Sequence, residues 1–185
     1  MTKAGSVPTD VPGDVSGNDL RIDEGYQIRI DRDGTWYYHG SPIRRQELVK
    51  LFSSVLRLDA SGDYWLVTPA ERGRIQVDDV PFTAVELTVQ GTGEDQRLIF
   101  RTNLDEEVIA GSDHPIRVEE DHGTGGPRPY ILVRDNLEAR ISRSVYYDLV
   151  ERAEMSEDRE EIQVGIWSMG TFFPLGRPMS RTPGN

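Results

Sequence analysis

Arginines gather around the beginnings of two predicted helices. Arg44 and Arg45 fall in the first turn of one, and Arg140 and Arg143 flank Ser142 at the start of the other. The unpaired backbone N–H groups of a helix amino end favour negative charge, so Asp or Glu is expected there. Free N–H groups, a serine hydroxyl and guanidinium groups together bind phosphate or carboxylate. The pattern therefore predicts an anion site.

Two interpretations of these arginines stay open. They contact a ligand, or they pair with nearby acids such as Asp31, Asp33 and Asp148. His39 ends a predicted strand beside the first helix start, where it donates to an anion or caps a turn. Aromatic side chains near the second helix stack on a base or pack in the core. The predicted ligand contacts are His39, Arg44, Arg45, Arg140, Ser142, Arg143, Tyr146 and Trp167.

No sequence motif names a reaction. The chain has no cysteine, which excludes thiolate nucleophiles and Cys-ligated metals, and it has neither a G-x-S-x-G motif nor a P-loop. The His-containing run 113–122 matches no zinc spacing. Asp78 and Asp79 are adjacent on an extended segment, so their carboxylates face opposite ways and do not share a site. We expect no metal and no cofactor, and we assign no catalytic residue.

The charge balance limits the class of partner. The net charge of −11 argues against bulk nucleic-acid binding, which needs a basic face, whereas a small phosphorylated ligand needs only a few arginines. No apolar run approaches the ~18 residues of a transmembrane helix, and residues 1–24 contain no signal-peptide core. We therefore expect a cytoplasmic protein without a membrane partner.

The pattern of short segments predicts an α+β fold with mostly antiparallel strands and one main helix in each of two packed halves. Polar, Gly- and Pro-rich ends at 1–22 and 177–185 are typical of disorder. Between them we expect an N-terminal α+β domain at 23–82 and a C-terminal β-rich domain with one helix at 83–176. The acidic run 156–161 predicts a solvated loop.

The first predicted helix follows a hairpin whose turn is residues 31–34. Ser41 is its predicted N-cap and Pro42 its first position, and the helix is expected to end near Asp59. Its expected apolar stripe is Leu48, Leu51, Phe52 and Val55, widened by Val49, Leu56 and Leu58. The second helix is expected from near Ser142 to about Met155.

A fainter copy of the hairpin and helix recurs without a gap 101 residues later, with Ser41 aligned to Ser142. Each copy would form a ββα(β) unit too small to make a core alone, so the two should pack together. Chance likeness between two hairpins that precede helices is the alternative.

Several segments resemble a bacterial family known as the domain of unknown function number 1285, over about residues 24–176. They are HGSPIRRQELVKLF, YWLVTP, IQVDDVPF, FRTN, RPYILVR, LEARISRSVYYDLV and WSMGTFFPLG. The resemblance implies a two-part α+β fold with a duplicated core and a C-terminal half superficially like a pleckstrin-homology barrel. It also implies a nucleotide-like ligand between the halves and a role in signal transduction, and it supplies no catalytic residues.

Three hypotheses of function follow. The first is a non-enzymatic protein that binds a phosphorylated or nucleotide-like ligand in a cleft between the halves. The second is a protein–protein interaction module, with a protein partner or a second copy of the chain, in which the arginines and aromatics form a hot spot. The third and weakest is a hydrolase that uses His39 or His114 with a carboxylate. A concave arrangement of the helix starts favours the first hypothesis, and a flat exposed patch favours the second.

Overall fold

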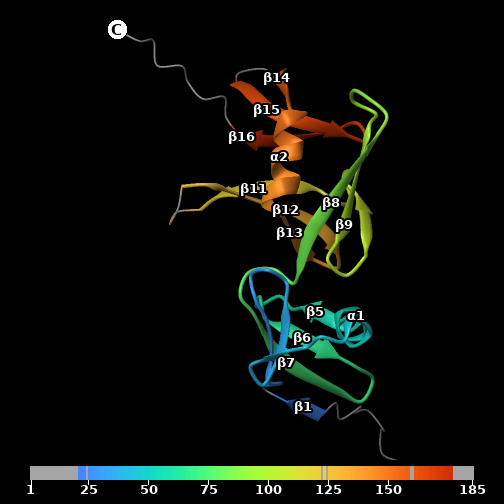
Figure 1. Ribbon diagram of the computed structural model, residues 1–185, viewed down its shortest axis with the longest axis vertical. Coiled ribbons are helices and arrows are strands. Elements are labelled where there is room, and N and C mark those ends of the chain that lie inside the picture. The colour runs from blue at the N-terminus through green and yellow to red at the C-terminus, as the bar shows by residue number, and fades with distance from the viewer. Residues whose placement is uncertain (1–20, 24, 122, 124, 159–160, 177–185) are drawn as a thin grey trace, which may run out of the picture.

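The chain folds into two β-rich halves that lie end to end along the long axis of the molecule (Figure 1). The structure, a computed structural model, describes residues 21–23, 25–121, 123, 125–158 and 161–176. The predicted α+β fold with two similar, mainly antiparallel halves is confirmed. The pleckstrin-homology-like form of the C-terminal half stays a prediction, and so do the disordered ends, since residues 1–20 and 177–185 lie outside the described residues.

The N-terminal half combines a seven-stranded sheet with one helix. Its elements are β1 (Arg21–Asp23), β2 (Ile28–Ile30), β3 (Trp36–Tyr38), β4 (Ser41–Pro42), α1 (Gln46–Ser54), β5 (Leu56–Leu58), β6 (Tyr64–Val67) and β7 (Glu71–Val77). The strand order is β4-β3-β2-β7-β6-β5, with β1 also paired to β7. Trp36 is 1% exposed and stacks on Phe52 of α1, with 6.3 Å between the ring centroids. This contact packs the helix against the sheet.

The C-terminal half contains two sheets with one helix between them. Its elements are β8 (Phe82–Gln90), β9 (Arg97–Thr102), β10 (Glu107–Ile109), β11 (Ile116–Glu120), β12 (Pro127–Arg134), β13 (Leu137–Ile141), α2 (Arg143–Glu151), β14 (Glu154–Asp158), β15 (Glu161–Ser168) and β16 (Thr171–Gly176). The six-stranded sheet has the order β10-β9-β8-β13-β12-β11, and β14-β15-β16 form the second sheet. Helix α2 contacts β8 of one sheet and β15 of the other, and Figure 1 shows it beside β8.

The order of hairpin, helix and three-stranded meander occurs in both halves. β2, β3, α1 and β5 to β7 correspond to β12, β13, α2 and β14 to β16. The sheet connections differ between the copies. In the first copy the parallel pairing of β7 with β2 joins meander and hairpin, whereas in the second the hairpin pairs with β8 and the meander forms its own sheet.

The predicted start of the first helix is wrong. Ser41 and Pro42 form strand β4, paired to Tyr38 and Tyr37 of β3, and the helix begins at Gln46 with Arg45 as its N-cap. The amide of Ile43 continues this pairing by donating to the carbonyl of Trp36 at 2.8 Å. Proline is tolerated on such an edge strand because its missing N–H is not needed there. Strand pairing therefore overrides the local capping signal.

The predicted end and core face of this helix also need correction. The helix ends at Ser54, and residues 56–58, expected to be helical, form β5. The buried positions of the helix are Val49 and Ser53, while Leu51 is 61% exposed. Leu48, Phe52 and Val55 of the predicted stripe are partly buried, and Phe52 and Val55 pack against the core, so Leu51 is the predicted core position that faces solvent.

Two further segments differ from their predictions. Arg21 and Ile22, which were assigned to the disordered arm, belong to β1. The acidic run 156–161 was expected to be a loop, but residues 156–158 end β14 and Glu161 begins β15, so the run borders a hairpin. Antiparallel pairing between Glu154–Asp158 and the following strand accounts for the difference, because the ladder satisfies backbone groups that a loop would leave to water.

Candidate functional site

The amino end of α2 is open. Ser142 is its N-cap, with φ −61° and ψ 156°, and its side chain makes no capping hydrogen bond. Arg143 is the first helical residue, and the first turn carries no acidic side chain. Strand β13 ends one residue earlier, and the Ser142 amide donates to the carbonyl of Ala84 in β8 at 3.0 Å. The sheet therefore fixes where the free N–H groups of this helix begin.

The turn between β2 and β3 brings the N-terminal half to the same place. The predicted turn at residues 31–34 is confirmed: the Gly34 amide donates to the Asp31 carbonyl at 3.0 Å, and Gly34 has φ +80°. Two residues of the C-terminal half hold this turn. Thr83 Oγ1 donates to the Asp33 carbonyl at 3.1 Å, and Asn103 Nδ2 donates to the Gly34 carbonyl at 3.2 Å.

A cavity of about 630 Å³ lies between this turn and the start of α2. Arg32 and Asp33 line it from the N-terminal half. Its other lining residues belong to the C-terminal half: Thr83, Gly126, Pro127, Pro129, Arg140, Ile141, Ser142, Arg143, Tyr146 and Tyr147. Three arginines and one aspartate thus surround the open end of a helix. The balance of charge in the cavity is positive in a protein whose net charge is −11.

Arg140 is held by a nearly buried carboxylate. Its Nη1 lies 3.5 Å from Asp79 Oδ2, a long contact, and the Asp79 side chain is 10% exposed. Asp79 also accepts from Arg128 at 3.2 Å and from the Tyr130 hydroxyl at 3.0 Å. Burial and this hydrogen bond to Asp79 raise the pKa of Tyr130. The Arg140 side chain is 35% exposed, and its contact with Asp79 involves only Nη1 among the contacts of the described residues.

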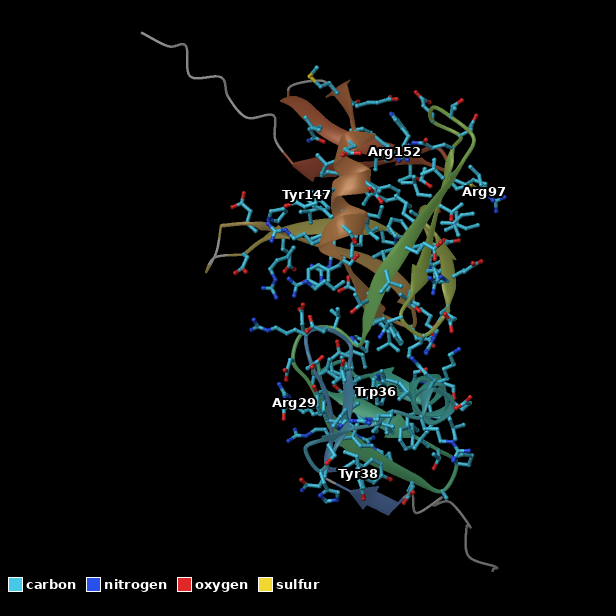
Figure 2. All side chains as sticks on the ribbon, viewed as in Figure 1. Arg29, Trp36, Tyr38, Arg97, Tyr147 and Arg152 are labelled. Carbon is cyan, nitrogen blue, oxygen red and sulfur yellow. The ribbon has the colours of Figure 1, made fainter. Side chains whose placement is uncertain are left out.

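Arg143 has an uncharged partner. Its Nε donates to the Tyr147 hydroxyl at 3.0 Å, and the guanidinium lies 5.6 Å from the centre of that ring. Among the described residues Arg143 forms no ion pair, so the alternative of pairing with acids does not apply to it. Tyr147 is 51% exposed and lies midway along α2, and Arg152 lies at the carboxyl end of that helix (Figure 2). A single arginine of this kind keeps its charge available to an anion.

Tyr146 contributes an apolar surface. Its hydroxyl donates to the carbonyl of Leu175 at 2.8 Å, and burial raises the pKa of this phenol. A phenol that donates to a carbonyl and resists ionisation is poorly suited to act as a base.

The structure does not bring the other predicted contacts to this cavity. Arg44 and Arg45 precede α1 on an exposed segment, and Glu47 occupies the first turn of that helix. His39 lies in the exposed turn after β3 with φ +48°, edge-on to Tyr38. Trp167 packs on Phe172 within the three-stranded sheet, with 5.2 Å between the centroids.

Sequence reasoning missed Arg32, Asp33 and the role of Asp79. Arg32 lies in a turn that was correctly predicted, but nothing local indicates that Thr83 and Asn103 hold that turn over α2. The prediction that Asp78 and Asp79 do not share a site is confirmed, since Asp78 pairs with Arg29 and Asp79 pairs with Arg140. Because adjacent side chains of an extended segment face opposite ways, the sequence could have indicated that each aspartate has its own arginine partner.

The part of the chain that the structure describes contains neither a candidate metal site nor a helix that could cross a membrane. No group of three or more His, Asp or Glu side chains within it could hold a metal ion. His114 Nδ1 lies 3.0 Å from the carbonyl of Leu132, and His122 lies outside the described residues. No helix among these residues is long and apolar enough to cross a membrane.

These features define a two-part α+β protein with an arginine-lined cavity between its halves. The chain belongs to the DUF1285 family, a family of unknown function. The model of the family's N-terminal domain matches residues 21–80, and the model of its C-terminal domain matches residues 81–175. Membership confirms the resemblance found in the sequence.

Two solved structures are similar to this chain. The crystal structure of a DUF1285 family protein from Silicibacter pomeroyi DSS-3 is 43% identical, with a TM-score of 0.77, over 85% of this chain and 83% of that one. A DUF1285 family protein from Shewanella baltica OS155 is 22% identical, with a TM-score of 0.54, over 68% of this chain and 91% of that one, and shows the fold alone. No curated protein matches the sequence.

Proposed function

We propose that this protein binds a small phosphorylated ligand in the cavity between its halves, without a chemical step. The observation that carries the proposal is the open amino end of α2 facing a 630 Å³ cavity lined by Arg32, Arg140 and Arg143. Backbone N–H groups and guanidinium forks are the two donor types that bind phosphate best in proteins.

The neighbouring groups support an anion over a cation. Among the described residues Asp79 is the one carboxylate partner of Arg140, which shares it with two other donors, and Arg143 has no carboxylate partner there. Asp33 is the single acid in the lining. An anion would therefore meet an excess of positive charge in a partly enclosed space, where charges are screened less than on an open surface.

The ligand has room for more than its phosphate. Tyr147 lies at the edge of the cavity with half its surface exposed, where a base or another flat group could stack on it. A nucleotide-like ligand is one member of this class. A role in signal transduction belongs to the same proposal, because reversible binding between two halves links a ligand to their relative position.

The test compares two charge reversals on one helix. Arg143→Glu removes a cavity donor, whereas Arg152→Glu makes the same change in charge at the other end of α2. Calorimetry with inorganic phosphate, pyrophosphate and a nucleoside monophosphate should show binding by the natural protein. Losing one charge-assisted contact of about 1.5–3 kcal/mol predicts affinity at least tenfold weaker for Arg143→Glu.

A folding defect does not explain that loss, since Glu in the first turn favours the helix. Equal affinities of the two variants would refute the assignment of the site. If no phosphate compound binds to the natural protein, the proposal fails and the interaction module becomes the better hypothesis.

A further inference from the structure

A second hollow continues from the cavity along α2. It has a volume of about 750 Å³ and lies among α2, β11, β15 and β16. Pro127, Tyr146 and Tyr147 line both hollows, so the two are adjacent and open onto the same side chains. The second hollow is mainly apolar, and its other apolar side chains are Val118, Val150, Val164, Pro174 and Leu175.

One face of α2 connects the two hollows. Ser142 and Arg143 face the first, the tyrosines one turn later face both, and Val150 one turn further faces only the second. Eight residues of helix separate Ser142 from Val150, which is about 12 Å at 1.5 Å per residue. A ligand that follows this face meets positive charge at one end and apolar surface over the rest.

The exposed apolar side chains on this face of α2 also indicate a binding surface. Tyr147 and Val150 are 51% and 44% exposed on neighbouring turns of one helix. Tyr146 also lines the groove, but it is only 9% exposed and its hydroxyl donates to the Leu175 carbonyl, so it forms part of the wall rather than an exposed contact. Adjacent exposed apolar side chains that line a hollow are typical of a binding surface.

Two carboxylates line the groove. Glu119 and Glu120 lie at the end of β11, where Glu119 pairs with Arg117 and Glu120 lies opposite Pro127 of β12, a residue that lines both hollows. A second anionic group in the groove would meet repulsion. The charge pattern therefore admits an anion at the start of α2 and an uncharged chain beyond it.

We propose that the ligand is a single-chain amphiphile, with one phosphate-type anion at the start of α2 and an alkyl chain in the groove. This inference rests on the proposed function and specifies its ligand class. A free alkyl phosphate and a phosphate lipid extracted from a bilayer share this chemistry.

The test measures affinity against chain length. Methyl, butyl, hexyl, octyl and decyl phosphate are titrated into the full chain by calorimetry, each below its micelle concentration. Burial in a half-open groove predicts a gain of about two- to fourfold per added methylene. Val150→Glu should lower the ratio of decyl to methyl phosphate affinity at least tenfold, whereas Leu51→Glu, the same change on the exposed face of α1, should leave that ratio unchanged.

A chain with phosphate at both ends provides a second arm. Repulsion by the carboxylates of the groove predicts that decane diphosphate binds more weakly than decyl phosphate. Sedimentation with phosphatidylcholine vesicles, with and without added lysophosphatidic acid, a single-chain phosphate lipid, then separates the two sources. Binding only to the vesicles that contain lysophosphatidic acid indicates a bilayer lipid, and no vesicle binding indicates a free amphiphile.

The outcomes separate this inference from the function on which it rests. Equal affinity for methyl and decyl phosphate would overturn the amphiphile and leave the phosphate site standing. Absence of binding by every phosphate, methyl phosphate included, would overturn both. An unchanged affinity ratio in Val150→Glu would overturn the placement of the chain along α2.

Discussion

Gly34 should be the glycine whose replacement most directly weakens the contact between the two halves. It has φ +80°, and an added Cβ would lie 2.8 Å from Asn103 Nδ2 and 2.9 Å from Thr83 Oγ1. These two side chains hold the turn that carries Arg32 over the cavity. Alanine at this position would therefore strain the backbone and displace the donors that fasten one half to the other.

The magnitude follows from two contributions. A left-handed conformation costs a residue with a Cβ about 1–2 kcal/mol. Losing two hydrogen bonds between the halves adds about 0.5–1.5 kcal/mol each. We expect Gly34→Ala to lower the free energy of unfolding by about 2–5 kcal/mol, a large share of the roughly 5–15 kcal/mol typical of a domain.

Gly40→Ala is the matched control. Gly40 has φ +78°, almost the same backbone strain, but an added Cβ there meets nothing within 4 Å. Urea denaturation of the two variants should therefore differ by about 1–3 kcal/mol, the contribution of the two hydrogen bonds. Equal losses would refute the reasoning, since they would show that the contacts of the turn with Thr83 and Asn103 add no stability.

Three other changes probe separate contacts. Gly73→Ala would place a Cβ 2.2 Å from the ring of Tyr26, so overpacking should lower the unfolding free energy by about 1–3 kcal/mol, and an unchanged urea midpoint would contradict this. Asp79→Asn removes the nearly buried charge that Arg128, Arg140 and Tyr130 share. We expect it to lower the free energy of unfolding in urea by about 1–3 kcal/mol, and an unchanged value would show that these contacts with Asp79 do not stabilise the fold. The hydrogen bond from Arg29 holds the pKa of Asp78 below its ordinary 3.8. The pair therefore stabilises the fold above pH 3.8, and this stabilisation is lost as the pH falls through the pKa that Asp78 has in the folded protein. The stability difference between the natural protein and Asp78→Asn should accordingly shrink below about pH 4 in acid titrations followed by circular dichroism, and a difference independent of pH would contradict the pairing.

Local signals sufficed where one segment determines its own structure. The turn at residues 31–34 was predicted from its turn-forming residues and Gly34. The structure shows why this local signal sufficed: Asp31 Oδ1 accepts from the amides of Asp33 and Thr35 within the same loop, and Gly34 supplies the positive φ. The start of the second helix near Ser142 was also predicted correctly, since α2 begins at Arg143 with Ser142 as its N-cap.

The same signals failed where distant strands compete. Ser41 and Pro42 look like a helix start, yet pairing with β3 makes them a strand, and Leu56 joins β6 where a helix was expected to continue. In both cases a ladder formed with another segment outweighs propensities of a few tenths of a kcal/mol per residue. The cavity itself was beyond local reasoning, because Arg32 reaches it only through the docking of one half on the other.

The two copies of the hairpin and helix have diverged at the position where the sequence made them look most alike. In the first copy β4 lies between hairpin and helix, Glu47 occupies the first turn of α1, and Arg44 and Arg45 lie outside the cavity. This helix also meets the other half through its later residues, since Lys50 pairs with Asp105 and the Ser53 carbonyl accepts from Arg134.

In the second copy α2 follows β13 almost directly, and its first turn is left without an acid. An acid in the first turn complements the dipole of a helix, and in the proposed site a ligand anion takes that role at α2. Of the two related helix starts, only the second therefore belongs to the proposed anion site. Arg44 and Arg45 of the first copy lie outside the cavity, so their replacement should leave phosphate affinity unchanged.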